Sequence, residues 1–134
     1  MGRILVKPGV AFAVIASEGF RILGSLDRVA REWSGDLMIT SGTDGVHSGP
    51  TDPHYLGKAY DVRTHDLQPE RKDQLLKLLL FDLMEHSSDV PLPVSGGLGT
   101  TQYWGWIEKR GTVAEHLHIQ CRQQAPPQKG PLIA

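Results

Sequence analysis

The sequence lacks the marks of several protein classes. It has one cysteine, Cys121, in 134 residues, which excludes an intramolecular disulfide and any zinc module built from several cysteines. Its longest apolar runs, Val10–Ala16 and Leu78–Phe81, are far too short to span a bilayer. Neither charge sign is in excess, because 14 Lys and Arg face 15 Asp and Glu, and this excludes a broad basic face for nucleic acid. We therefore expect neither a nucleic-acid partner nor a membrane partner.

The overall composition of the chain is typical of one globular domain. Hydrophobic residues make up 40% of the chain and charged residues 22%, both near the globular average. We place the domain at residues 1–122 and expect it to be monomeric. The segment Gln123–Ala134 has three prolines and no apolar periodicity, which predicts a flexible C-terminal tail. Pro8-Gly9 interrupts the approach to the first apolar run, so we expect no signal peptide, and the sequence predicts no cellular location.

Two segments have the apolar spacing of helices. From about Ala13 to Trp33, large apolar side chains recur every three or four residues, and Ser34-Gly35 is suited to end the helix. The segment Glu70–His86 carries a broad stripe of leucines, and Pro69 is placed to begin it. We expect this leucine stripe to face the core.

Four other segments have the composition of strands, namely Asp36–Ser41, Lys58–Thr64, Tyr103–Glu108 and Val113–Gln120. The last two are expected to form a hairpin around Lys109-Arg110-Gly111. The polar loop Gly42–Pro53 is long for a compact domain, and loops of this length are usually functional or mobile. Adjacent strands without regular βαβ crossovers predict an α+β fold with a mainly antiparallel sheet packed with helices.

Several histidines lie where a metal site could form. His47 and His54 lie in or after the polar loop, Asp61 follows His54 by seven residues, and His116 and His118 share the last expected strand. Two imidazoles and one carboxylate suit zinc, which is bound by four ligands and leaves one position to water in catalytic sites.

A carboxylate outside the ligand set could accept a proton from that water, and Glu115 is the best candidate. The offset of three residues puts Glu115 and His118 on opposite faces of a regular strand. The role of base therefore requires Glu115 to lie at the end of the strand or on a bulge.

The histidines, Asp61 and Glu115 belong to a longer pattern that resembles a known family. The pattern Ser48-(x5)-His54-(x2)-Gly57-(x)-Ala59-(x)-Asp61, with Glu115-(x2)-His118 downstream, resembles the zinc D,D-carboxypeptidase/L,D-endopeptidase family, and phage endolysins in particular. Members cleave stem peptides of the bacterial cell wall. The resemblance covers about Phe20 to Gln120, most of the chain.

The resemblance implies the hedgehog/D,D-peptidase fold and a Zn2+ ion bound by His54, Asp61 and His118. It implies that Glu115 is the catalytic base and that His47 lines the site. The expected partner is a bacterial cell-wall peptide, cut at a D,D-, an L,D- or an L-alanyl-D-glutamate bond.

The chain departs from the family pattern at two points. Many members carry an arginine soon after the first strand that is thought to stabilise the developing oxyanion, whereas this chain has Thr43 and Asp44 there. Arg63 shares the strand face of Asp61 and could replace that arginine, clamp a substrate carboxylate, or form an ordinary surface pair. The second departure is Leu117, which flanks His118 in place of an aromatic residue.

Other residues keep two interpretations. His116 shares a strand face with His118 and is expected to be an outer-sphere or surface residue. Trp104 and Trp106 alternate along one strand, so they pack in the core or form a wall of the substrate groove. Cys121 is expected to be a small buried hydrophobe.

The leading hypothesis is a zinc metallopeptidase that acts on peptidoglycan stem peptides. One rival is a non-catalytic, hedgehog-like, zinc-containing binding module. Another is a zinc hydrolase of a different small amide. Glu115 favours an enzyme over the binding module, because a structural zinc needs no base.

Overall fold

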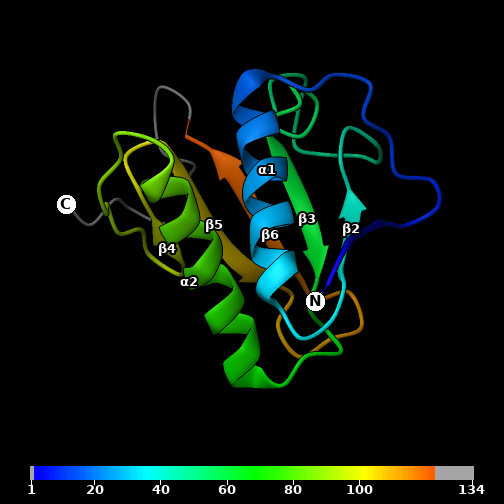
Figure 1. Ribbon diagram of the computed structural model, residues 1–134. Helices are drawn as coiled ribbons and strands as arrows, with labels where there is room; N and C mark the ends of the chain where they lie inside the picture. Colours follow the sequence, from blue (N-terminus) through cyan, green and yellow to red (C-terminus); the bar gives the residue numbers. More distant parts are fainter. Residues whose placement is uncertain (1, 123–134) are drawn as a thin grey trace.

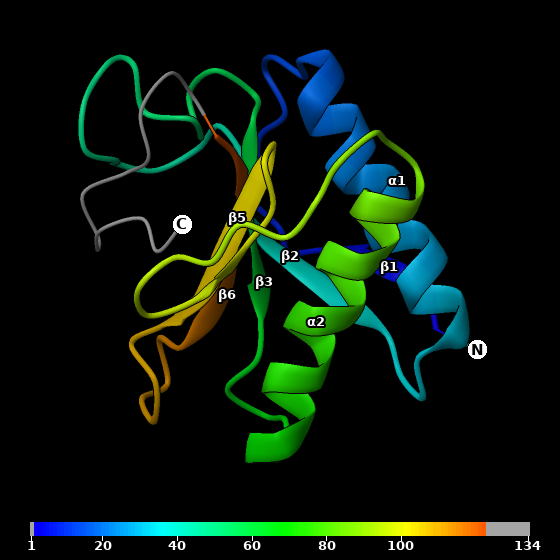
Figure 2. The same cartoon turned by 90° about the vertical axis from the view of Figure 1, so that its left-hand side faces the viewer.

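A six-stranded sheet carries two helices on one of its faces, and the loop between β2 and β3 lies on the other side (Figures 1 and 2). The computed structural model describes residues 2–122, so the expected tail, 123–134, lies outside the described residues. The elements in chain order are β1 (Ile4–Val6), α1 (Ser17–Glu32), β2 (Leu37–Ser41), β3 (Ala59–Arg63), α2 (Pro69–Glu85), β4 (Leu98–Gly99), β5 (Tyr103–Glu108) and β6 (His116–Cys121).

The strands lie in the order β1-β2-β3-β6-β5-β4. β1 and β2 are parallel, and every other neighbouring pair within residues 2–122 is antiparallel. The expected α+β fold with a mainly antiparallel sheet is thereby confirmed. Neither helix among these residues is long and apolar enough to cross a membrane.

The structure differs from the sequence-based expectation at the edges of the sheet. It adds β1 and β4, which are three and two residues long and form by pairing with β2 and β5. The last strand begins at His116 instead of Val113, because the chain first makes a turn in which the Glu115 N–H donates to the Thr112 carbonyl. The first helix begins at Ser17, four residues later than expected.

The two faces of the sheet have different roles, because side chains alternate along each strand. Tyr60 and Val62 of β3, with Leu117 and Ile119 of β6, pack against the helices and form the core. The leucine stripe of α2 and Cys121 belong to this core, as expected. The opposite face of β3 and β6 is polar, and it carries the candidate site.

Candidate metal centre

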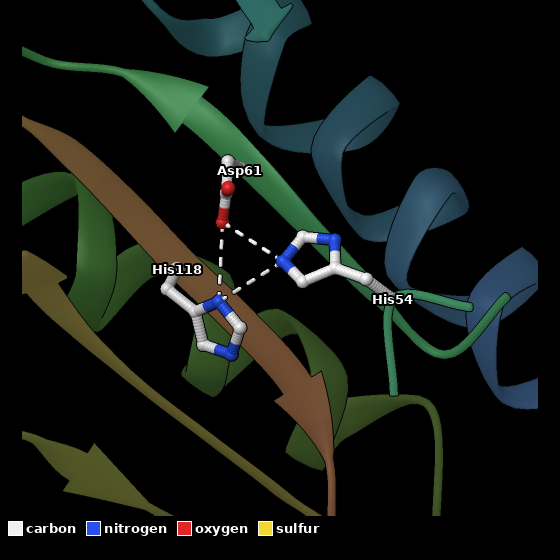
Figure 3. A group of neighbouring side chains, drawn as sticks. All are labelled: His54, Asp61 and His118. Atoms are coloured by element: carbon white, nitrogen blue, oxygen red, sulfur yellow. Dashed lines mark hydrogen bonds and ion pairs between the residues drawn. The ribbon is translucent and has the colours of Figure 1, made fainter. Parts of the chain in front are cut away.

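Three side chains converge on the sheet face that the helices leave open (Figure 3). Asp61 of β3 and His118 of β6 are direct partners in the antiparallel register, and His54 approaches from the turn before β3. His54 Nε2 lies 3.3 Å from His118 Nδ1 and 3.3 Å from Asp61 Oδ1, and the last two atoms are 3.1 Å apart. All three residues are buried, and together they could hold one metal ion. The structure thus brings together the three ligands that the resemblance implied.

The turn before β3 holds His54 in place. The Asp52 carboxylate accepts the His54 backbone N–H at 2.9 Å, and the Gly57 N–H donates to the His54 carbonyl at 3.2 Å. Gly57 has a φ of 70°, and a Cβ there would lie 2.2 Å from the Val14 carbonyl oxygen, so only glycine fits. The His54 ring is oriented by its Nδ1–H, which donates to the Gly42 carbonyl at 2.9 Å. This bond leaves Nε2 directed at the cluster.

The electrostatics of the cluster favour a cation. Burial on its own would raise the pKa of Asp61, but hydrogen bonds from His118 and His54 outweigh it and hold that pKa well below its usual range. Burial would likewise lower the pKa of His54, yet the hydrogen bond and charge of Asp61 outweigh it and raise that pKa. A buried carboxylate therefore stays charged between two imidazoles, which is a suitable environment for a positive ion.

The cluster opens into a cavity of about 880 Å³. Trp104 and Trp106 line it, with their rings stacked at 3.8 Å between centroids, and the Trp106 ring stacks on His118 at 5.1 Å. They pack with Val94 in a small cluster separate from the main core. The two tryptophans are therefore packed in a small core cluster and also line the cavity, so both interpretations left open for them apply.

His47 lies at the cluster, as the resemblance implied. Its ring stacks on His54 with 3.9 Å between centroids, and its Nε2–H donates to the Asp44 carbonyl at 2.8 Å. Thr43 and Asp44, which stand where the resemblance would lead one to expect an arginine, hold the segment Ala11–Ala13 against the loop through three hydrogen bonds. Arg63 is not among the residues that line the cavity.

Glu115 does not join the cluster. Its carboxylate accepts hydrogen bonds from Lys72 Nζ at 2.8 Å, from the Thr64 hydroxyl at 2.8 Å and from the Gly111 N–H at 2.9 Å. Only 2% of Glu115 is exposed, and its ion-pair partner lies on α2, so the side chain points to the helix side of the sheet. Glu115 lies in the turn just before β6, at the end of the strand as the role of base required, but its bonds to Lys72, Thr64 and Gly111 hold the carboxylate away from the cluster. The role of catalytic base is therefore not supported for Glu115.

The Lys72–Glu115 ion pair is expected to stabilise the fold. Lys72→Met leaves a buried carboxylate without its cation, which should lower the free energy of unfolding by about 3 to 5 kcal/mol. Urea denaturation at pH 7 measures this, and Lys77→Met, on the exposed side of the same helix, is the matched control. Equal stability of the two variants would contradict the assignment.

The pH dependence of that stability has a definite sign. Burial on its own would raise the pKa of Glu115, but the bonds from Lys72, Gly111 and Thr64 outweigh it and lower that pKa below its usual value of 4.5. The stabilisation is therefore complete above about pH 4.5 and is lost as the pH falls through the lower, folded-state pKa. The wild-type protein and the Lys72→Met variant should converge in stability under acid conditions.

Glu108 is the carboxylate that sequence reasoning missed. It lines the cavity, with Oε1 at 4.0 Å from His118 Nδ1 and Oε2 at 3.8 Å from His116 Nε2. His116 Nε2 also lies 3.6 Å from Asp61 Oδ2, so this imidazole stands between two carboxylates. The sequence feature that could have identified it is the alternation of side chains along β5, which puts Glu108 on the same face as Trp104 and Trp106.

Comparisons of the chain with protein-family models, curated proteins and solved structures found no match.

Proposed function

We propose that the protein is a zinc-dependent peptidase that cleaves stem peptides of bacterial peptidoglycan. The observation that carries this proposal is the buried group of His54, Asp61 and His118, which opens into a cavity that also holds Glu108. A metal-capable group that borders a cavity and a second carboxylate is typical of a catalytic site, whereas a structural site is closed.

The spacing of the three donor atoms supports zinc as the ion. A tetrahedral zinc site with ligand distances of about 2.0 to 2.1 Å has ligand-to-ligand distances of about 3.3 to 3.4 Å. The three distances here are 3.1, 3.3 and 3.3 Å. Two imidazole nitrogens and one carboxylate oxygen are also donors that zinc accepts. The residues present therefore fit a zinc ion with little movement.

The residues around the group can each take a different role in amide hydrolysis. Zinc, when bound, would supply an activated water and polarise the scissile carbonyl, chemistry that side chains alone do not provide. Glu108 would accept the proton of the attacking water and deliver it to the leaving amine. His116, between Asp61 and Glu108, is placed to hydrogen-bond the reacting oxygen.

The cavity also offers features for a peptide substrate. Trp104 and Trp106 provide an apolar wall beside the metal ligands. Among the residues that line the cavity, Lys109 carries the fixed positive charge. We assign to Lys109 the contact with a substrate carboxylate that was one of the roles open to Arg63.

The resemblance to the zinc D,D-carboxypeptidase/L,D-endopeptidase family supports the same conclusion. The motif residues His54, Asp61 and His118 lie together, and the α+β fold with its mainly antiparallel sheet is compatible with the hedgehog/D,D-peptidase fold. Glu115 can no longer separate an enzyme from a hedgehog-like binding module, because it bonds to Lys72. Glu108 takes over that role and favours the enzyme.

Digestion of purified muropeptides, analysed by mass spectrometry, tests the function. The zinc-loaded protein is expected to shorten or divide the stem peptide, a chelator is expected to stop the reaction, and added zinc is expected to restore it. Zinc binding without cleavage of any stem bond would contradict the proposal and favour a binding module. Cleavage of small amides alone would instead favour another zinc hydrolase.

A further inference from the structure

Gln120 contacts the ring of His118 on the side away from the cluster. The Gln120 Oε1 atom lies 2.8 Å from His118 Nε2, while His118 Nδ1 faces Asp61 and His54. Gln120 is two residues farther along β6, on the same sheet face, and only 4% of it is exposed. The contact is therefore shielded from solvent and joins two neighbouring side chains of one rigid strand.

The amide of Gln120 has one favourable orientation. Its Nε2 donates to the Cys121 carbonyl at 3.1 Å. A rotation of the amide by 180° would bring the Gln120 oxygen against that carbonyl oxygen, which cannot donate. The backbone of β6 thus directs the Gln120 oxygen at His118.

This orientation determines which ring nitrogen of His118 carries a proton. Because an amide oxygen only accepts hydrogen bonds, His118 Nε2 must carry a proton. A metal ion binds the neutral imidazole, and in that form the lone pair lies on Nδ1, the atom that faces Asp61 Oδ1 and His54 Nε2. The Gly42 carbonyl acts in the same way on His54 Nδ1, so the metal-binding form of His54 directs the lone pair of Nε2 into the cluster.

We propose that Gln120 is a positioning residue of the metal centre: it fixes the tautomer and ring orientation of His118 so that Nδ1 is ready to bind the ion. The inference rests on the zinc site of the proposed function, but it requires no peptidase activity. Outer-sphere hydrogen bonds of this kind orient metal-binding histidines, and their loss typically weakens metal affinity by roughly 10- to 100-fold.

The test is a zinc titration of the full-length, metal-free protein against a chromophoric chelator at fixed pH. Gln120→Leu removes the acceptor and should weaken zinc binding by roughly 10- to 100-fold. Gln120→Glu keeps an acceptor at the same reach and should bind zinc as tightly as the wild-type protein or more tightly. Gln74→Leu, the same change at an exposed position of α2, is the matched control and should leave the affinity unchanged.

A second readout separates positioning from a general effect on the fold. Cobalt substituted for zinc reports ligand geometry through its visible absorption, which Gln120→Leu should alter and Gln120→Glu should preserve. If Gln120→Leu does not fold, Gln120→Asn replaces it, because the shorter amide cannot reach His118. Thermal melting of the metal-free variants shows that they are folded.

The outcomes are distinct. A folded Gln120→Leu or Gln120→Asn variant with wild-type zinc affinity and cobalt spectrum would overturn the inference and leave the proposed function standing. Wild-type protein that binds zinc without hydrolysing stem peptides would overturn the function, while the Gln120 series would still measure the positioning role. Wild-type protein that binds no zinc would overturn both.

Discussion

Glu108→Gln should lower the turnover of a stem peptide by roughly 10²- to 10⁴-fold, the contribution of a general base, while the zinc content stays that of the wild-type protein. Glutamine has nearly the shape of glutamate but cannot accept the proton of the attacking water. The Glu108 carboxylate lies 4.0 Å from His118 Nδ1, beside the candidate metal-binding group and outside its three residues. The measurement is the rate of muropeptide cleavage, with the zinc content of each sample determined in parallel.

Glu115→Gln is the matched control for this experiment. It makes the same chemical change at the position that the family motif suggests as base, but it acts on the far side of the sheet, where Glu115 bonds to Lys72. We expect it to reduce stability and to leave any turnover by the folded protein near that of the wild type. The reverse pattern, with turnover lost in Glu115→Gln and kept in Glu108→Gln, would contradict the assignment of the base.

Asp61→Ala should abolish both zinc binding and peptidase activity. Asp61 supplies the charged donor of the group, and without it two neutral imidazoles remain. The loss of zinc affinity should exceed the roughly 10- to 100-fold that an outer-sphere partner costs, because a direct ligand is removed. Zinc titration and muropeptide cleavage of the same samples give the two readouts.

Asp66→Ala is the control for Asp61→Ala, since Asp66 is an exposed aspartate a few residues farther along the chain. It should bind zinc and cleave peptide as the wild-type protein does. If Asp61→Ala kept its zinc while folded, the ion would have to bind elsewhere, and the ligand assignment would be wrong.

The local pattern of the chain was enough to predict most of the fold. The leucine spacing of α2 and the alternation in β3 and β5 are properties of short windows, so the sequence alone predicts these elements. The strands β1 and β4 could not be found in this way, because each has too few residues for a pattern and exists through pairing with a distant segment. The late start of β6 has a similar cause, since the turn before it is held by Lys72 on α2 and by Thr64 after β3.

The candidate site was predictable where the motif and the alternation agreed. His54, Asp61 and His118 follow the family spacing and also satisfy the geometry of neighbouring strands. Glu115 follows the family spacing, but it lies in the turn before β6, where bonds to Lys72, Thr64 and Gly111 hold it away from the cluster. Glu108 and Gln120 lie on the correct face by the period of two, yet no motif identified them.

The proposed site holds one zinc ion, bound by His54, Asp61 and His118. Anomalous diffraction at the zinc absorption edge, from crystals of the zinc-loaded protein, tests it most directly. We predict one strong peak, at about 2.0 to 2.2 Å from His54 Nε2, His118 Nδ1 and Asp61 Oδ1. A peak at other residues, or none at this group in protein that has taken up zinc, would show that these three residues are not the zinc ligands.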